Sequence, residues 1–260
     1  MNSQQPKLKG ILFDLDDTLI DWSGFTGDWR AMEHRHLANV YHFLAEKGRP
    51  LDASLEEFEE EYVIRTREAW ANGRATLRAP HVTQILEGSL AYFGYEADEL
   101  VSIAACMDVY DWGAVPGVEV FPDVPPMLQK FLDRGLSIGI ITNASQPMSI
   151  RDNELKAFGL LPYFQDDAIR LAAADVGYLK PHPEIFRYTL DKMGAQPEEA
   201  IYIGDNPVAD IAGAQGAGMR AVLRRKEGVP PLISGLIVPD GIIESLYDLP
   251  DLLNEWYPGW

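Results

Sequence analysis

The sequence lacks the features that would tie it to a membrane or to an oxidising compartment. It has a single cysteine, Cys106, so no disulfide can form within the chain, which is typical of a protein kept in a reducing compartment. No stretch approaches the roughly 18 apolar residues of a membrane span. The first ten residues, MNSQQPKLKG, lack the apolar core of a signal peptide. We therefore expect a cytoplasmic protein without a membrane partner.

Basic residues are also scarce. The chain has 22 Lys and Arg against 40 Asp and Glu, a formal net charge of −18. Nucleic acids and anionic membranes would be repelled at long range, so we expect neither as a partner. A small anionic substrate would need a local cation, which a Lys, an Arg or a metal ion can supply. Nothing in the sequence predicts an oligomeric state.

Short apolar runs alternate with helical patterns along much of the chain. Its 260 residues are 47% hydrophobic and 24% charged, as in an ordinary globular protein with a sizeable core. The runs predict strands of a parallel sheet covered on both faces: GILFDLDD, LSIGIITN, AIYIGDN, MRAVLRR and SGLIVPD. The patterns between them predict helices: PPMLQKFLDRG, PEIFRYTLDKMG, ADIAGAQGAGM and ESLYDLPDLL. The fold class is therefore α/β.

Residues 21–114 show a different pattern: apolar residues recur at helical spacing, and no segment is convincing as a strand. Four segments carry it: GDWRAMEHRHLANVYHFLAEKG, SLEEFEEEYVIRTREAWANG, VTQILEGSLAYFG and DELVSIAACMDVY. Ser54 and Glu57 form a capping-box pattern at the start of the second. A strand–helix–strand unit takes about 30 residues, which leaves this region as an insertion. We expect a helical domain, residues 21–114, inserted into an α/β core made of residues 1–20 and 115–260.

Three carboxylates follow the first apolar run, in GILFDLDDTLI. Asp14 and Asp16 lie two positions apart, so in an extended segment they point the same way, whereas Asp17 points elsewhere. This alternation favours Asp14 and Asp16 as a working pair. Carboxylates at the carboxyl end of a parallel strand lie where open α/β sheets bind their ligands.

Later strand ends supply further polar groups. IGIITN ends in Thr142 and Asn143, GYLKP carries Lys180, and IYIGDNPVAD carries Asp205 and Asp210. Parallel strands would gather these groups along one edge of the sheet. Four carboxylates and one lysine need a further cation, and Mg²⁺ is the hard divalent ion that oxygen ligands suit. Such a cluster is what phosphoryl transfer requires.

Taken in order, DLDDT, IITN, GYLKP and GDNPVAD match the four motifs of the haloacid dehalogenase-like hydrolase superfamily, which this chain resembles. The inserted helices resemble the helical cap of that superfamily. The resemblance implies a doubly wound parallel sheet, a Rossmann-like core, with an all-helical cap domain. It also implies a Mg²⁺-dependent phosphatase that binds a small phosphorylated metabolite between core and cap.

The same resemblance implies roles for these residues. Asp14 would be the nucleophile that forms an aspartyl-phosphate, and Asp16 the general acid and base, with a raised pKa. The Mg²⁺ ligands would be Asp14, the carbonyl of Asp16, Asp205 and Asp210. The phosphate oxygens would be held by Thr142 and Lys180, and by backbone N–H groups around Leu15 and Asn143.

Other functions remain open beside this one. Haloacid dehalogenases lack an acid at the position of Asp16, so DLDDT argues against dehalogenation. A phosphomutase or phosphonatase relative would use the same nucleophile. A phosphoacceptor receiver module also combines acids, a lysine and Mg²⁺, but it has no inserted helices and is about half as long. A non-catalytic relative is a third alternative.

The joint NGRATLRAPH, between two predicted helices, carries Arg74, Arg78 and His81. These side chains either face the substrate and set specificity or belong to a solvated loop. Trp22 and Phe25, just after the first motif, either line the entrance to the site or pack the hinge.

Overall fold

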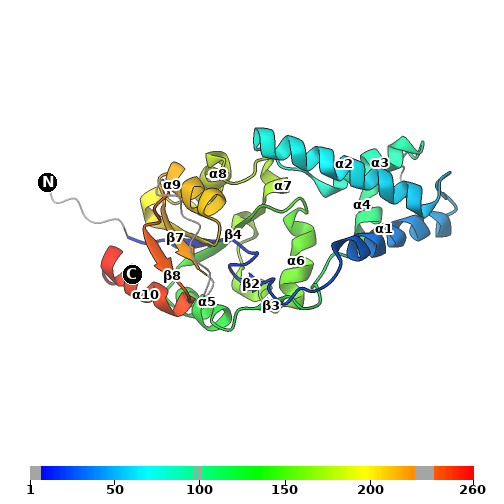
Figure 1. The fold of residues 1–260 in the computed structure, drawn as a ribbon. Helices are drawn as coiled ribbons and strands as arrows, with labels where there is room; N and C mark the ends of the chain where they lie inside the picture. The colour runs from blue at the N-terminus through cyan, green and yellow to red at the C-terminus, as the bar shows by residue number, and fades with distance from the viewer. Residues whose placement is uncertain (1–6, 97, 99–100, 226–236) are drawn as a thin grey trace.

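A six-stranded parallel sheet forms the core of the protein. The structure, a computed structural model of the chain, describes residues 7–96, 98, 101–225 and 237–260. The strand order is β5-β4-β1-β6-β7-β8 (Figure 1). The strands are β1 Gly10–Phe13, β4 Ser137–Thr142, β5 Arg170–Ala172, β6 Ala200–Gly204, β7 Arg220–Arg224 and β8 Gly241–Ile243. This sheet confirms the predicted α/β class and places β1 between β4 and β6.

Both faces of the sheet are apolar and covered. Along β1, Ile11 and Phe13 belong to one buried cluster and Leu12 belongs to another, because successive side chains of a strand point to opposite faces. The first cluster includes residues of α5 (Val124–Asp133), α6 (Met148–Ala157) and α10 (Leu249–Trp256). The second includes residues of α7 (Ala173–Val176), α8 (Pro183–Met193) and α9 (Gly213–Gly216). Coverage on both sides explains why the strands read as continuous apolar runs.

One of the predicted strands is wrong. The segment SGLIVPD does not form a strand in its described part, residues 237–240; residues 234–236 lie outside the described residues. The last strand, β8, begins only at Gly241 and pairs with β7. Pro239 explains the shift, because proline has no N–H to donate to a neighbouring strand, and backbone pairing starts at Asp240.

The predicted helices of the core are present, with local differences. The segment ADIAGAQGAGM contains a π-helical turn, Pro207–Ala212, followed by the short α9. The helix α6 and the strand β5 were not predicted, because α6 is mostly polar and β5 is only three residues long. Among the described helices, none combines the length and apolarity needed to cross a bilayer.

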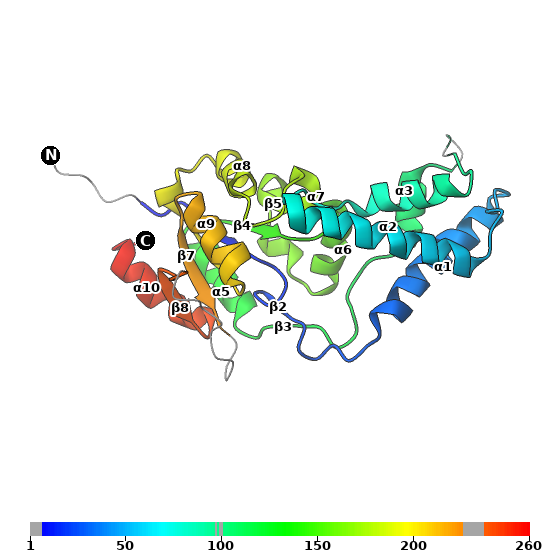
Figure 2. The ribbon, with the colours of Figure 1, turned by 45° about the horizontal axis from the view of Figure 1, so that its top comes forward.

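The predicted helices of residues 21–114 lie together to one side of the sheet (Figures 1 and 2). They are α1 Trp29–Glu46, α2 Leu55–Thr76, α3 Val82–Tyr92 and α4 Ile103–Tyr110. Their buried side chains, Cys106 among them, form a third apolar cluster. The capping box of Ser54 and Glu57 is present. We propose that residues 21–114 are a domain of their own, as the sequence predicts.

Two connections join these helices to the sheet, and a small antiparallel pair of strands holds them side by side (Figure 2). The pair consists of β2 Ile20–Asp21 and β3 Glu119–Val120. Just beyond it the backbones nearly touch: a Cβ added to Gly24 would lie 2.4 Å from the carbonyl oxygen of Gly117. The sequence did not predict these strands, which are too short to show a pattern.

A buried ion pair links the carboxyl-terminal segment to the rest of the core. The carboxylate of Asp123, at the start of α5, accepts hydrogen bonds from Arg224 at 2.9 and 3.0 Å. It also accepts hydrogen bonds of 2.6 Å each from the hydroxyl of Ser245 and the backbone N–H of Leu246. Arg224 in turn donates to the carbonyl oxygen of Thr18 at 2.9 Å. The end of the chain is thereby joined to the loop that follows β1.

Candidate active site

The ends of three neighbouring strands bring the predicted site residues to one edge of the sheet. Asp14 directly follows β1, Thr142 is the last residue of β4, and Asp205 directly follows β6. Since β1 pairs in parallel with both β4 and β6, their carboxyl ends lie next to one another.

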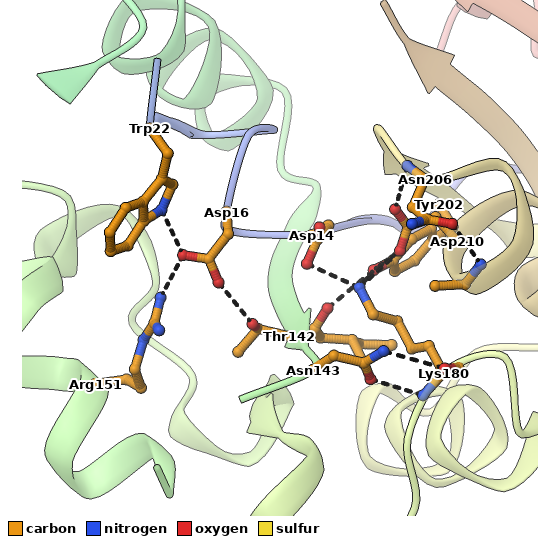
Figure 3. Close-up of polar contacts among 12 residues, drawn as sticks. Asp14, Asp16, Trp22, Thr142, Asn143, Arg151, Lys180, Tyr202, Asn206 and Asp210 are labelled. Carbon is orange, nitrogen blue, oxygen red and sulfur yellow. Dashed lines mark hydrogen bonds and ion pairs between the residues drawn. The ribbon is translucent and has the colours of Figure 1, made fainter. Parts of the chain in front are cut away.

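Lys180 lies at the centre of a buried cluster (Figure 3). Its ammonium nitrogen is 2.8 Å from Oδ1 of Asp14 and 2.7 Å from Oδ1 of Asp210. It also donates a hydrogen bond of 2.8 Å to the hydroxyl of Tyr202. Burial alone would lower the pKa of Lys180, but the two carboxylates outweigh it and raise the pKa to about 12. The lysine is therefore charged at neutral pH.

The backbone of Lys180 is fixed by Asn143, the residue after β4. The backbone N–H of Lys180 donates to Oδ1 of Asn143 at 2.7 Å, and Nδ2 of Asn143 donates to the carbonyl oxygen of Lys180 at 3.1 Å. This reciprocal pair ties the lysine loop to the strand end. The side chain of Asn143 thus has a positioning role that its motif did not reveal, and its predicted backbone contact with phosphate stays a prediction.

Asp210 is fully buried beside Lys180 and has a complete set of partners. Its Oδ2 accepts a hydrogen bond of 2.9 Å from the backbone N–H of Asn206, and its Oδ1 lies 3.3 Å from the hydroxyl of Tyr202. Gly204 makes room for this carboxylate, because a Cβ there would lie 2.3 Å from Cγ of Asp210. Sequence reasoning missed Tyr202; its only signal was a hydroxyl within a fully buried strand, where it must find a partner.

Three carboxylates of this cluster fit a divalent cation. Oxygen atoms of Asp14, Asp205 and Asp210 lie within 4.8 Å of one another. Burial raises the pKa of Asp14 well above its usual value, Lys180 opposes that rise, and Asp210 adds to it. Burial and the charge of Asp210 raise the pKa of Asp205 to about 7. The cluster thus holds more negative charge than one ammonium offsets, and hard oxygen ligands of this kind suit Mg²⁺.

The carboxylate of Asp16 points away from this cluster (Figure 3). Its Oδ1 accepts hydrogen bonds from the indole of Trp22 at 2.9 Å and from Arg151 at 2.8 Å. Its Oδ2 accepts a hydrogen bond of 3.2 Å from the hydroxyl of Thr142. Strand alternation predicted a common direction for Asp14 and Asp16, but β1 ends at Phe13, so the regular alternation of a strand does not extend to Asp16, which precedes a turn at residues 17–19.

The pKa of Asp16 differs from the expected one. Burial alone would raise it, but the charge of Arg151 and the hydrogen bonds from Arg151, Trp22 and Thr142 outweigh burial and lower the pKa. A raised pKa was expected for a general acid. Arg151, which the sequence did not single out, is the physical reason for the difference.

Arg151 comes from α6 and is itself held by Glu154. Its side chain is only 5% exposed, and its Nε lies 2.8 Å from Oε2 of Glu154, which is fully buried. Burial raises the pKa of Glu154 to about 7, although the charge of Arg151 acts in the opposite direction. Asp16, Arg151 and Glu154 therefore form a second charged group beside the lysine cluster.

A cleft of about 1150 Å³ lies between the sheet edge and the helices of residues 21–114. Asp16, Asn143 and Arg151 line it from the core, and α1 and α2 line it from the opposite side. Trp22 and Phe25 also line the cleft, and both pack against the ring of Trp29. These contacts are compatible with both interpretations of the two aromatic residues, entrance and hinge packing, and both stay predictions.

Arg74, Arg78 and His81 have other surroundings. Arg74 is exposed in the last turn of α2. The guanidinium of Arg78 stacks 4.3 Å from the ring centroid of Tyr178, and His81 accepts a hydrogen bond from the backbone N–H of Thr83, in α3. None of the three is among the residues that line the cleft. This geometry therefore gives no support to their predicted contact with substrate.

Comparison with known families gives a match over most of the chain. Residues 8–218 match the family model described as haloacid dehalogenase-like hydrolase. The matched range contains the strands and loops that carry Asp14, Thr142, Lys180 and Asp205.

Similar proteins cover nearly the whole chain. Glyceraldehyde 3-phosphate phosphatase of Methanopyrus kandleri is 29% identical over 95% of this chain and 98% of its own length. Human N-acylneuraminate-9-phosphatase is 25% identical over 96% of this chain and 95% of its own length. Among solved structures, a 2-haloacid dehalogenase from Pseudomonas syringae pv. Tomato DC3000 superposes with a TM-score of 0.62. It is 29% identical, and the match covers 96% of this chain and 99% of that one.

Proposed function

The chain belongs to the haloacid dehalogenase-like hydrolase family, and from this membership we propose that it is a Mg²⁺-dependent phosphatase of a small phosphorylated metabolite. The observation that carries the proposal is the buried Lys180, whose ammonium lies within 2.8 Å of both Asp14 and Asp210. The names of similar phosphatases from other organisms support the same reaction class.

Asp14 is the proposed nucleophile. A carboxylate oxygen of Asp14 attacks phosphorus while the bond from phosphorus to the ester oxygen breaks, which gives an aspartyl-phosphate and an alkoxide. Asp16 gives a proton to that alkoxide and later takes one from water, which attacks the phosphorus and frees Asp14. Because the negative phosphate raises the pKa of a nearby carboxyl group, substrate binding would counter the effect of Arg151 on Asp16.

The residues around Asp14 prepare the site for an anion. Lys180 offsets negative charge on Asp14 and on the phosphate, and the hydroxyl of Thr142 is available to a phosphate oxygen once it leaves Asp16. Asp14, Asp205, Asp210 and the carbonyl of Asp16 are the proposed ligands of Mg²⁺. When bound, this ion would neutralise the charge that develops on the transferred phosphoryl group.

Asp16 distinguishes this proposal from dehalogenation, the activity named for the structurally similar protein from Pseudomonas syringae. A halide leaves without a proton, whereas an alkoxide needs one. The side chain of Asp16 is 35% exposed and lines the cleft, so a leaving group can reach it. This acid favours a phosphate ester as the substrate.

A screen for phosphate release tests the proposal. The chain would be incubated with a panel of phosphorylated metabolites, with Mg²⁺ or with a chelator, and halide release from 2-haloacids would be followed in parallel. We expect Mg²⁺-dependent phosphate release and no halide. Halide release without phosphate release would contradict the proposal, and transfer of phosphate to a second position of the substrate would indicate a mutase.

A further inference from the structure

The guanidinium of Arg151 has one side that the protein leaves unused. Nη2 donates to Asp16 at 2.8 Å, and Nε faces Glu154 at 2.8 Å. Among the described residues, none accepts a hydrogen bond from Nη1. Arg151 is one of the residues that line the cleft, so this third nitrogen is available to a ligand bound there.

The guanidinium is also fixed in place. Glu154, one turn further along α6, is fully buried, and its Oε2 lies 2.8 Å from Nε of Arg151. The ring of Trp112 covers the guanidinium at 5.9 Å from its centroid. A planar guanidinium held on two sides is pre-organised, so little conformational freedom is lost when its remaining donor binds.

Arg151 lies next to the position of the leaving group. Under the proposed function, Asp16 protonates the ester oxygen, and a general acid lies about 2.6–3.2 Å from the atom it protonates. Arg151 is 2.8 Å from the same carboxylate. A group attached one or two carbons from the ester oxygen is therefore within reach of the guanidinium.

We propose that Arg151 binds a carboxylate of the substrate. The preferred substrates are phosphate monoesters whose leaving group carries a carboxylate one or two carbons from the ester oxygen. This inference rests on the proposed function, because the site of Asp16 defines where the leaving group lies. A hydrogen bond from the charged Nη1 to a carboxylate oxygen is charge-assisted, and such hydrogen bonds are stronger than those between neutral groups.

The other arginines of the cleft do not compete for this role. Arg30 and Arg67 line the cleft from α1 and α2, but both are exposed. Exposed charges interact weakly because solvent screens them. With a net charge of −18 the chain exerts no long-range attraction on an anion, so a buried local cation has to hold it.

A binding experiment in an inactive background tests the inference. With Asp14→Asn to prevent turnover and with Mg²⁺ present, calorimetry would compare 2-phosphoglycolate with its primary amide, which differs only in the carboxylate. We expect the carboxylate to bind about 10- to 100-fold more tightly. Adding Arg151→Met should bring this ratio close to one, Arg151→Lys should retain part of it, and Arg67→Met should leave it unchanged.

The ratio of the two affinities reports on recognition of the carboxylate, because the two ligands differ in that group alone. A ratio near one with Arg151 intact would overturn the inference, as would a high ratio that survives in Arg151→Met. The first measurement needs no substitution at Arg151 and so does not depend on how that variant folds. If the chain releases phosphate from esters but the two ligands bind equally well, the phosphatase proposal holds and the inference about Arg151 is wrong. If the affinity ratio is as expected but the unmodified chain releases no phosphate, the carboxylate site holds and the phosphatase proposal is wrong.

Discussion

The hydroxyl of Tyr202 accepts a hydrogen bond of 2.8 Å from the ammonium of Lys180. It donates its own proton to the carbonyl oxygen of Ile141, 2.9 Å away. The phenol thus joins the backbone of β4 to the charged cluster, and it does so from a fully buried position in β6. Its place between a strand and a cation makes it a structural support of the site.

Tyr202→Phe should therefore destabilise the protein. The variant leaves the buried carbonyl of Ile141 without its donor and removes one acceptor from Lys180, which costs about 1–3 kcal/mol. Urea unfolding followed by circular dichroism measures the loss. Tyr247→Phe, at a tyrosine that is 58% exposed, is the matched control and should be neutral. Equal stability of the two variants would show that the buried hydroxyl contributes nothing.

Asp14→Asn should abolish phosphate release, by a factor of at least about 1000, since an amide cannot act as the nucleophile. Mass spectrometry after rapid acid quenching should detect one added phosphoryl group on the unmodified chain, on the peptide that contains Asp14. Asp251→Asn, an exposed carboxylate on α10, should keep full activity. A phosphoryl group found on any other peptide would assign the nucleophile elsewhere.

Removal of a proposed metal ligand should weaken the response to Mg²⁺. An ion that binds only the folded state stabilises it, by about 2.7 kcal/mol at a concentration of 100 times its Kd. We therefore expect Mg²⁺ to raise the Tm of the unmodified chain and of Asp251→Asn. The same Mg²⁺ concentration should raise the Tm of Asp205→Asn much less. A full shift in Asp205→Asn would exclude this carboxylate as a ligand.

Glu154 predicts a pH dependence of stability. Its pKa is about 7 in the folded protein against a usual value of 4.5. Because the folded state holds this proton more tightly than the unfolded chain, the contribution of Glu154 to stability falls as pH rises from about 4.5 to 7 and is constant above that range. The total change is at most about 3 kcal/mol.

Glu154→Gln, which cannot titrate, isolates this effect. Relative to the unmodified chain, the variant should be more stable at pH 8 than at pH 5, seen as a larger free energy of unfolding when urea unfolding is measured at both values. Glu255→Gln, at an exposed position of α10, should show no such difference. A difference of the opposite sign would mean that Arg151 lowers the pKa of Glu154 more than burial raises it.

The gathering of Asp14, Lys180, Asp205 and Asp210 at one sheet edge could be predicted because it follows from topology. Parallel strands read as apolar runs, and the polar residues that end such runs meet at the same edge. The linear order of the motifs was enough to name these residues.

Groups that act through tertiary contacts could not be predicted in this way. Arg151 lies on a polar helix whose pattern resembles a surface segment, and only the fold brings it to Asp16. Tyr202 reads as one more apolar residue of a strand. Conversely, the sequence suggested that Arg78 could contact the substrate, but the structure shows its guanidinium stacked on the ring of Tyr178.

The ion pair of Asp123 and Arg224 has a consequence for the integrity of the chain. Two of the donors to Asp123 belong to Ser245 and Leu246, near the carboxyl terminus. If proteolysis removed the chain from Ser245 onward, the buried carboxylate of Asp123 would lose these two donors and keep only Arg224, which also donates to the carbonyl oxygen of Thr18. Residues 245–260 of this hydrolase therefore support its active site from a distance, because their loss would disturb the loop that follows β1 and carries Asp14 and Asp16.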